Sequence, residues 1–242
     1  MIESPVIAAF INKTEQEMDK GPIRATLAIQ KLIRDFEFDS VLDVGLGPGK
    51  HAKIFEHFGK KVSSCDMVAL HNPTYLGDFV DLEDKIPDNS FDCIWASHVL
   101  EHQVNVANFL ITAKKKLKDD GILAITVPPA KGQIVGGHVT IWNLGLLVYN
   151  LVSAGFDCSA GSGARYPAYD ISFIVRKKDI GWNDELLKEL GLKYSSVSKE
   201  GALVADGGDF FKLKPFFPSD TPWVPHGIDQ SFNGDLGTLG PW

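Results

Sequence analysis

Cysteine is scarce in this 242-residue chain, and long apolar runs are missing from it. Its three cysteines, Cys65, Cys93 and Cys158, are too few and too odd in number for a disulfide framework. They predict reduced thiols and therefore a cytoplasmic protein. Because no run of about 18 or more apolar residues exists, we expect no transmembrane helix and no membrane partner. The first residues also lack the basic start and apolar stretch of a secretory signal.

An excess of basic charge is missing as well. The chain carries 24 lysines and arginines against 31 aspartates and glutamates, which gives a formal net charge of −7. Proteins that wrap nucleic acid usually present a basic face, so this charge argues against a nucleic-acid partner. Hydrophobic residues make up 44% of the chain and charged residues 23%, a composition that excludes a mostly disordered protein. The sequence leaves a homo-oligomer open.

Short apolar strands alternate with amphipathic helices along most of the chain. Strands are predicted at residues 40–44, 61–65, 75–80, 91–96, 122–127, 156–159 and 171–175. Helices are predicted at residues 4–18, 23–36, 50–58, 98–117 and 143–154. This alternation predicts a doubly wound α/β fold with a mostly parallel sheet that helices cover on both faces. The last two strands have no helix between them, which indicates an antiparallel pair at one end.

A glycine-rich turn follows the first strand, and from Asp43 to Gly49 it has the pattern D-x-G-x-G-x-G. A turn of this kind between a strand and a helix is typical of a nucleotide-cofactor site. Glycines at positions 45, 47 and 49 allow the backbone to turn tightly and to approach the ligand. A dinucleotide fingerprint would need one more glycine at position 50, where Lys50 stands. A purely structural turn from strand to helix is the alternative.

This pattern resembles motif I of the class I S-adenosylmethionine (SAM)-dependent methyltransferases. SAM has a cationic amino group and a sulfonium but no pyrophosphate, so a carboxylate beside the turn suits it. The resemblance implies that Asp66, at the end of the second strand, accepts hydrogen bonds from both ribose hydroxyls. Gly77–Leu82 resembles the stretch that contacts adenine, and there we favour Asp81 over Asp78 as the acid. The implied cofactor-binding residues are Asp43, Gly45, Gly47, Gly49, Asp66, Met67, Asp81, Leu82 and Ser97.

Further segments resemble the same family in the same order along residues 38–177. They are Pro87–Ile94, similar to P-D-x-S-F-D-x-V; Ser97–His102; Leu117–Leu123, with Asp120 in place of a glycine; and Gly137–Phe156. The last of these has a histidine–aromatic start and an A-G-F end, which are common among small-molecule and sugar methyltransferases. The resemblance therefore implies a Rossmann-like sheet of seven strands with an antiparallel last strand, and SAM as the cofactor.

The implied reaction moves the methyl group of SAM to an oxygen or nitrogen of a small molecule, or of a sugar or glycan intermediate. Because SAM is already activated, the protein mainly aligns the reactants and excludes water. A base is needed only where the acceptor loses a proton during attack, and His98, His102 and His138 are the candidates. The fourth and fifth strands run into Ser97–His98 and Pro128–Pro129, which supply no acidic cluster, so no metal is expected.

Residues 38–178 are predicted to form the SAM-binding domain. A helical lid at residues 1–37 precedes it, and an irregular extension rich in aromatic residues, glycine and proline follows at residues 179–242. Two other functions remain open. One is a SAM-binding subunit that does not catalyse and acts through a partner. The other is a zinc hydrolase, because His98 to His102 matches H-x-x-E-H, and on a helix the two histidines would share one face.

Overall fold

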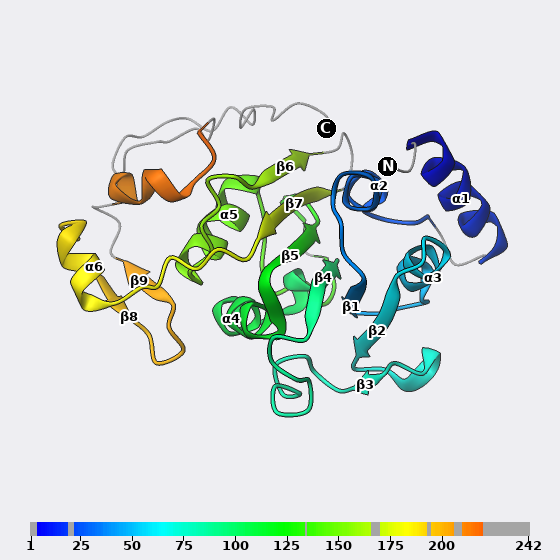
Figure 1. Cartoon of the computed structure of the whole chain (residues 1–242), viewed down its shortest axis with the longest axis horizontal. Helices are drawn as coiled ribbons and strands as arrows, with labels where there is room; N and C mark the ends of the chain where they lie inside the picture. The colour runs from blue at the N-terminus through cyan, green and yellow to red at the C-terminus, as the bar shows by residue number, and fades with distance from the viewer. Residues whose placement is uncertain are drawn as a thin grey trace.

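The computed structural model describes residues 4–18, 22–133, 135–165, 170–192, 195–205 and 210–219. A seven-stranded sheet with the order β3-β2-β1-β4-β5-β7-β6 forms its centre (Figure 1). The strands are β1 Ser40–Val44, β2 Lys61–Asp66, β3 Tyr75–Leu76, β4 Phe91–Ser97, β5 Leu117–Val127, β6 Ser162–Arg165 and β7 Ile171–Arg176. Strands β1 to β5 pair in parallel, whereas β7 pairs antiparallel with both β5 and β6. The predicted fold class is therefore confirmed, including the antiparallel last strand.

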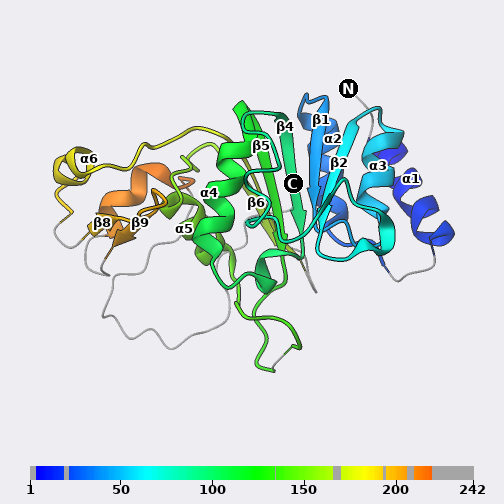
Figure 2. The same cartoon turned by 90° about the horizontal axis from the view of Figure 1, so that it is seen from below.

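Helices cover both faces of the sheet (Figure 2). They are α1 Ser4–Glu17, α2 Thr26–Asp35, α3 Lys50–His57, α4 Val106–Lys116 and α5 Leu144–Ser153. Buried apolar side chains of α1, α2 and α3 form one core with one face of the sheet. Those of α4 and α5 form a second core with the other face. Two hydrophobic layers thus hold the carboxyl ends of the parallel strands in fixed positions.

Helix α2 belongs to one of these layers. Its residues Ala28, Ile29 and Leu32 are fully buried, and the helix contacts β5 and β7. Burial of these three apolar side chains contributes about 4–7 kcal/mol to holding the helix on the sheet. A movement of residues 1–37 as a lid stays a prediction, but α2 forms part of the core of the central domain in this structure.

The segment after residue 179 contains short elements of its own. They are α6 Asp184–Glu189, β8 Ser195–Val197, β9 Leu203–Ala205 and the 3₁₀ helix η3 Phe210–Phe216. Trp182, Leu187 and Leu213 are buried in the same core as α4 and α5. The sequence predicted an irregular segment here because its apolar residues show little periodicity. The sequence left open whether this segment packs over the domain or is partly mobile, and its described part packs on the domain. Residues 193–194, 206–209 and 220–242 lie outside the described residues.

The predicted helix over residues 98–117 is wrong in its first half. Helix α4 begins only after Asn105, whose side-chain oxygen accepts a hydrogen bond from the backbone N–H of Asn108 at 3.1 Å and caps the helix. His98 has a left-handed φ of 58°, which a helix does not allow. Residues 98–105 therefore form a loop with a single 3₁₀ turn, η2 Leu100–His102.

Two predicted strands are also shorter or displaced. Residues 75–80 form a strand only at Tyr75–Leu76, because the Asp78 side chain accepts a hydrogen bond from the Val80 N–H at 3.0 Å and turns the chain. Residues 156–159 form no strand beyond an isolated bridge between Phe156 and Asp179. The Asp157 side chain similarly accepts from the Ser159 N–H at 3.0 Å, and the edge strand follows only at β6.

The three cysteines are free and buried, in agreement with the prediction of reduced thiols. None of the helices in the described part of the chain is long and apolar enough to cross a bilayer.

Candidate functional site

The glycine turn joins β1 to α3 at the carboxyl end of the sheet. Gly45, Gly47 and Gly49 all have positive φ angles, of 79°, 50° and 77°. The backbone N–H of Gly45 donates to the carbonyl oxygen of Cys65 at 2.8 Å, which holds the turn against β2. A Cβ atom at Gly45 would lie 2.3 Å from Cγ2 of Val99, so only glycine fits there. The turn therefore presents bare backbone to the space in front of the sheet.

Asp66 holds this turn in place from the end of β2. Its Oδ2 accepts a hydrogen bond from the N–H of Gly47 at 2.8 Å, and its Oδ1 accepts one from the N–H of Val68 at 2.8 Å. Each carboxylate oxygen can accept a further hydrogen bond, because it has two lone pairs. The carboxylate is thus oriented at the edge of the turn and keeps acceptor capacity for a ligand.

A cavity of 330 Å³ opens between the glycine turn and the loop after β4. We call it the cofactor cavity. The predicted site residues that line it are Gly45, Gly47, Asp66, Met67, His98 and His102. Its wall also includes Asp78 and Phe79, beyond the end of β3. The wall thus combines open backbone, carboxylates and apolar side chains, a lining that suits a ligand with hydroxyl groups and a planar ring.

The other predicted site residues lie behind or beside this cavity. Asp43 is fully buried in β1, where burial and the negative charge of Asp66 raise the pKa of its carboxyl. Leu82 is buried, and its side chain packs against Gly77, where an added Cβ would lie 3.3 Å from it. Asp81 is exposed and is not in the cavity wall. Gly49, Ser97 and His138 are also outside that wall.

His98 forms two hydrogen bonds with carboxylates. Its Nδ1 lies 3.2 Å from Oε1 of Glu101, and its Nε2 lies 2.9 Å from Oδ1 of Asp170. Burial disfavours the charged imidazolium, but the hydrogen bonds and charges of Asp170 and Glu101 outweigh it and raise the pKa of His98 to about 9. The ring is therefore protonated at neutral pH, so it cannot accept another proton as a base.

Asp170 connects this pair to the start of helix α2. Its Oδ2 accepts a hydrogen bond from the N–H of Ala25 at 2.8 Å, and Ala25 has a left-handed φ of 54°. Burial opposes ionisation of Asp170, but its bonds to His98 and Ala25 lower the pKa of the carboxyl. The positioning roles of Asp170 and Glu101 were missed in the sequence. Asp170 follows His98 by more than seventy residues, and no local motif joins the two.

His102, in the loop after β4, contacts His138, in the loop after β5. The carbonyl oxygen of Gly137 lies 2.7 Å from Nδ1 of His102, and because a carbonyl only accepts, that nitrogen carries a proton. The His102 and His138 rings are in edge contact, with their centroids 5.1 Å apart. The structure therefore does not place His98 and His102 on one face of a helix, as the H-x-x-E-H alternative requires.

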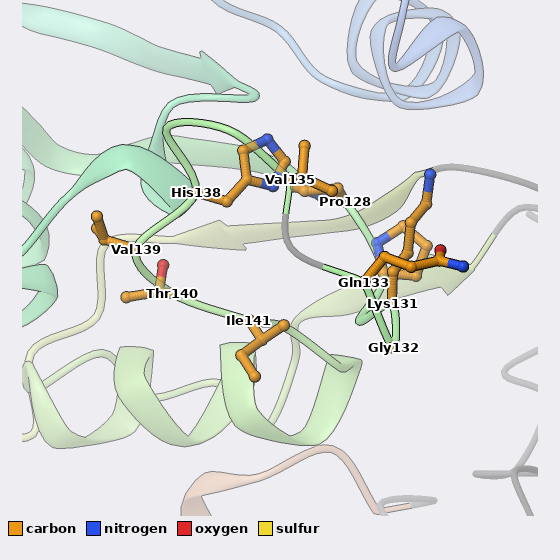
Figure 3. A pocket seen from close by; sticks show the side chains of 10 residues that line it. Pro128, Lys131, Gly132, Gln133, Val135, His138, Val139, Thr140 and Ile141 are labelled. Carbon is orange, nitrogen blue, oxygen red and sulfur yellow. The ribbon is translucent and has the colours of Figure 1, made fainter.

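A second cavity of 320 Å³ lies beside His138. We call it the loop cavity, because its lining residues come from residues 128–133 and 135–141, which follow β5. Figure 3 shows the side chains of its wall, with His138 next to Val135 on one side and Lys131 with Gln133 on the other. His102 lines the cofactor cavity and His138 lines the loop cavity, so their contacting rings lie between the two cavities.

A sequence model of a methyltransferase domain family matches residues 15–148, more than half of the chain. The chain belongs to this methyltransferase family. Its fold resembles that of a SAM-dependent methyltransferase from Archaeoglobus fulgidus, with a TM-score of 0.51, 14% identity, and coverage of 72% of this chain and 95% of that one. No curated protein matches the chain in sequence.

A second solved structure is that of the Burkholderia thailandensis 1,6-didemethyltoxoflavin-N1-methyltransferase with bound 1,6-didemethyltoxoflavin and S-adenosylhomocysteine. It has a TM-score of 0.55 and 18% identity, and the match covers 72% of this chain and 88% of that one. SAM is the cofactor of the methyltransferase described here. The bare backbone at Gly45 and the oriented carboxylate of Asp66 fit it, as the motif resemblance predicts.

Variants of Asp78 and Asp81 can test which of these two acids contacts the cofactor. Asp78 lines the cofactor cavity and Asp81 does not, so we expect Asp78→Ala to weaken SAM binding about 10-fold, the size of one lost charge-assisted hydrogen bond. Asp81→Ala is the matched control and should leave the dissociation constant unchanged. Isothermal titration of each variant with SAM measures the difference. The reverse order of effects would restore Asp81, the residue favoured from the sequence.

Proposed function

We propose that this methyltransferase moves a methyl group from SAM to an oxygen or nitrogen of a small molecule or sugar that binds in the loop cavity. The proposal rests on the contact between His102 and His138, because one ring lines the cofactor cavity and the other lines the loop cavity. The Burkholderia thailandensis protein with this fold holds the small molecule 1,6-didemethyltoxoflavin. The net charge of −7 also favours a small acceptor over nucleic acid.

SAM supplies a methyl group that is already activated by the positive sulfonium. The chain has to orient the two reactants in line, since alignment and removal of water account for most of the catalysis in such a transfer. Gly45 and Asp66 orient the cofactor from the carboxyl ends of β1 and β2. The acceptor's nucleophilic atom lies at the His102–His138 pair. Of the three predicted bases, these two remain, because His98 is protonated at neutral pH.

Asp66→Ala is expected to lower the affinity for SAM by about 10- to 100-fold. The variant loses the hydrogen bonds that the Asp66 carboxylate would accept from the cofactor and the one that it accepts from the N–H of Gly47. A hydrogen bond to a charged group is worth about 1.5–3 kcal/mol. Calorimetric titration with SAM and S-adenosylhomocysteine, alongside circular dichroism, separates lost binding from unfolding. Tight binding by the folded Asp66→Ala variant would remove Asp66 from the cofactor site.

Turnover is then measured with a panel of sugars, small alcohols and amines, by following S-adenosylhomocysteine with mass spectrometry. We expect one class of acceptor to be methylated, and His138→Gln to reduce kcat/KM for it at least 10-fold without changing SAM affinity. His57→Gln is the control, because His57 stacks on Phe10 among the helices of the opposite layer. SAM binding without turnover on any acceptor would favour the alternative of a non-catalytic partner subunit.

A further inference from the structure

Glu101, His102 and His138 form a cluster of potential metal ligands between the two cavities. One ligand atom from each lies within 4.8 Å of the others, and Nε2 of His102 is 3.9 Å from Oε1 of Glu101. The first two residues belong to the 3₁₀ turn η2, whereas His138 comes from the loop after β5. The sequence expectation of no metal considered acids at the ends of strands four and five, and this cluster lies beyond both ends.

Backbone hydrogen bonds hold the two segments together. The N–H groups of Val139 and Thr140 both donate to the carbonyl oxygen of Glu101, at 2.8 and 3.2 Å. The hydroxyl of Thr140 donates to the carbonyl oxygen of Leu100 at 3.1 Å. The position of His138 relative to Glu101 is thus fixed by three bonds that do not involve the ligand side chains.

His102 has the tautomer that a metal ligand needs. Its Nδ1–H donates to the carbonyl oxygen of Gly137, so the neutral ring keeps its lone pair on Nε2, which faces the cluster. Histidines that bind metal almost always donate their other ring N–H to a backbone carbonyl or a carboxylate in this way. Gly137 has a φ of +80°, and a Cβ there would lie 3.4 Å from Nδ1 of His102. Glycine is therefore favoured at the residue whose carbonyl oxygen accepts this hydrogen bond.

The carboxylate of Glu101 provides the second, independent observation. Glu101 is only 1% exposed. Its Oε1 lies 3.2 Å from Nδ1 of His98 and 3.9 Å from Nε2 of His102. Within the described part of the chain, no group donates a hydrogen bond to its other oxygen, Oε2. A buried carboxylate oxygen without a partner is costly, so Glu101 has room for one further positive or donating group.

We propose that Glu101, His102 and His138 bind one divalent transition-metal ion, with Zn²⁺ as the best fit. Two imidazoles and one carboxylate form one of the common donor sets of catalytic zinc sites, which keep the fourth position open. Mg²⁺ fits less well, because it prefers oxygen ligands and retains water. Ligand atoms around zinc lie roughly 3.3 Å apart, so the three ligand atoms would have to approach one another by at most about 1.5 Å. His102 is exposed and His138 is partly exposed, which leaves them room to move.

The position gives such an ion a use, and this step rests on the proposed function. The cluster lies between the cofactor cavity, which His102 lines, and the loop cavity, which His138 lines, and the proposed function puts the acceptor's nucleophilic atom there. A metal ion lowers the pKa of a bound hydroxyl by several units. An acceptor alcohol would thus lose its proton to water as its oxygen forms the bond to the methyl group and the bond from methyl to sulfur breaks. No histidine would then have to act as a base.

The first test uses the full chain, freed of metal with a chelator and without SAM or acceptor. Titration with Co²⁺ followed by visible absorption, and competition with Zn²⁺, should show one equivalent bound with a Zn²⁺ dissociation constant in the micromolar range or below. Mg²⁺ should compete at least 100-fold more weakly. His102→Ala and His138→Ala should each lower the Zn²⁺ affinity at least 10-fold, whereas His57→Ala should not.

The test relies first on the His102 and His138 variants, because these side chains lie nearer the surface than Glu101 and their replacement disturbs the fold less. Glu101→Gln is added only if circular dichroism shows that this variant is folded. Zinc binding that is absent, or that is unchanged in the His102→Ala, His138→Ala double variant, would overturn the metal site. Titration of the same metal-free protein with SAM is run in parallel. SAM binding without zinc binding would refute the metal site alone, and zinc binding without methyl transfer would refute only the proposed function.

Discussion

Replacing Gly45 with alanine is expected to lower the affinity for SAM about 100-fold. Gly45 has a φ of +79°, a conformation that costs a residue with a Cβ roughly 1–2 kcal/mol. The new methyl group would also lie 2.3 Å from Cγ2 of Val99, so either the turn or the loop after β4 has to move. Both line the cofactor cavity, and a 100-fold loss corresponds to about 2.7 kcal/mol. Isothermal titration with SAM measures it.

Gly59→Ala is the matched control for the backbone strain. Gly59 has nearly the same φ, +77°, but no heavy atom lies within 4 Å of the position its Cβ would take. This variant should lose roughly 1–2 kcal/mol of unfolding free energy and no SAM affinity. Adding Val99→Ala to Gly45→Ala should recover part of the binding, because it removes the atom that the methyl group meets. Equal SAM affinity in Gly45→Ala and the wild type would contradict this account of the turn.

The parts of the site that could be predicted from the sequence are those that local patterns determine. The turn from Gly45 to Gly49 follows a buried strand directly, and Asp66 stands at the end of the next strand. Parallel strands end at the same edge of a sheet, so these residues meet once the order of the strands is set. Strand β1 was predicted with its observed bounds, because its apolar run is short and a glycine turn ends it.

The loop after β4 could not be predicted, because distant residues determine it. The apolar periodicity of residues 98–117 favours a helix, but His98 takes a left-handed conformation and its ring is held by Asp170. The carbonyl of Glu101 is likewise bound by Val139 and Thr140 from another loop. These contacts join segments far apart in the chain, so tertiary interactions here override a local helical preference. The same contacts bring His102 to His138.

The charged group of His98 should make the stability of the protein depend on pH in the alkaline range. Its pKa is about 9 in the folded protein and about 6.5 in an unfolded chain. A raised histidine pKa adds stability that is fully present below pH 6.5 and is lost as the pH rises through 9. The side chain is 18% exposed, and the shift corresponds to about 3 kcal/mol. Urea unfolding at pH 6 and at pH 9.5 should show a loss of this size.

Two variants separate this effect from the lysines that also titrate at high pH. His98→Gln cannot be protonated, so its stability should fall less than that of the wild type between the two pH values, by about 3 kcal/mol. Asp170→Asn removes one of the two carboxylates and should retain part of the difference, because Glu101 still faces the ring. Asp170→Asn should also weaken the hold on the start of α2, since Ala25 then donates to a neutral oxygen. Parallel pH curves for His98→Gln and the wild type would show that His98 is neutral, and would return it to the candidate bases.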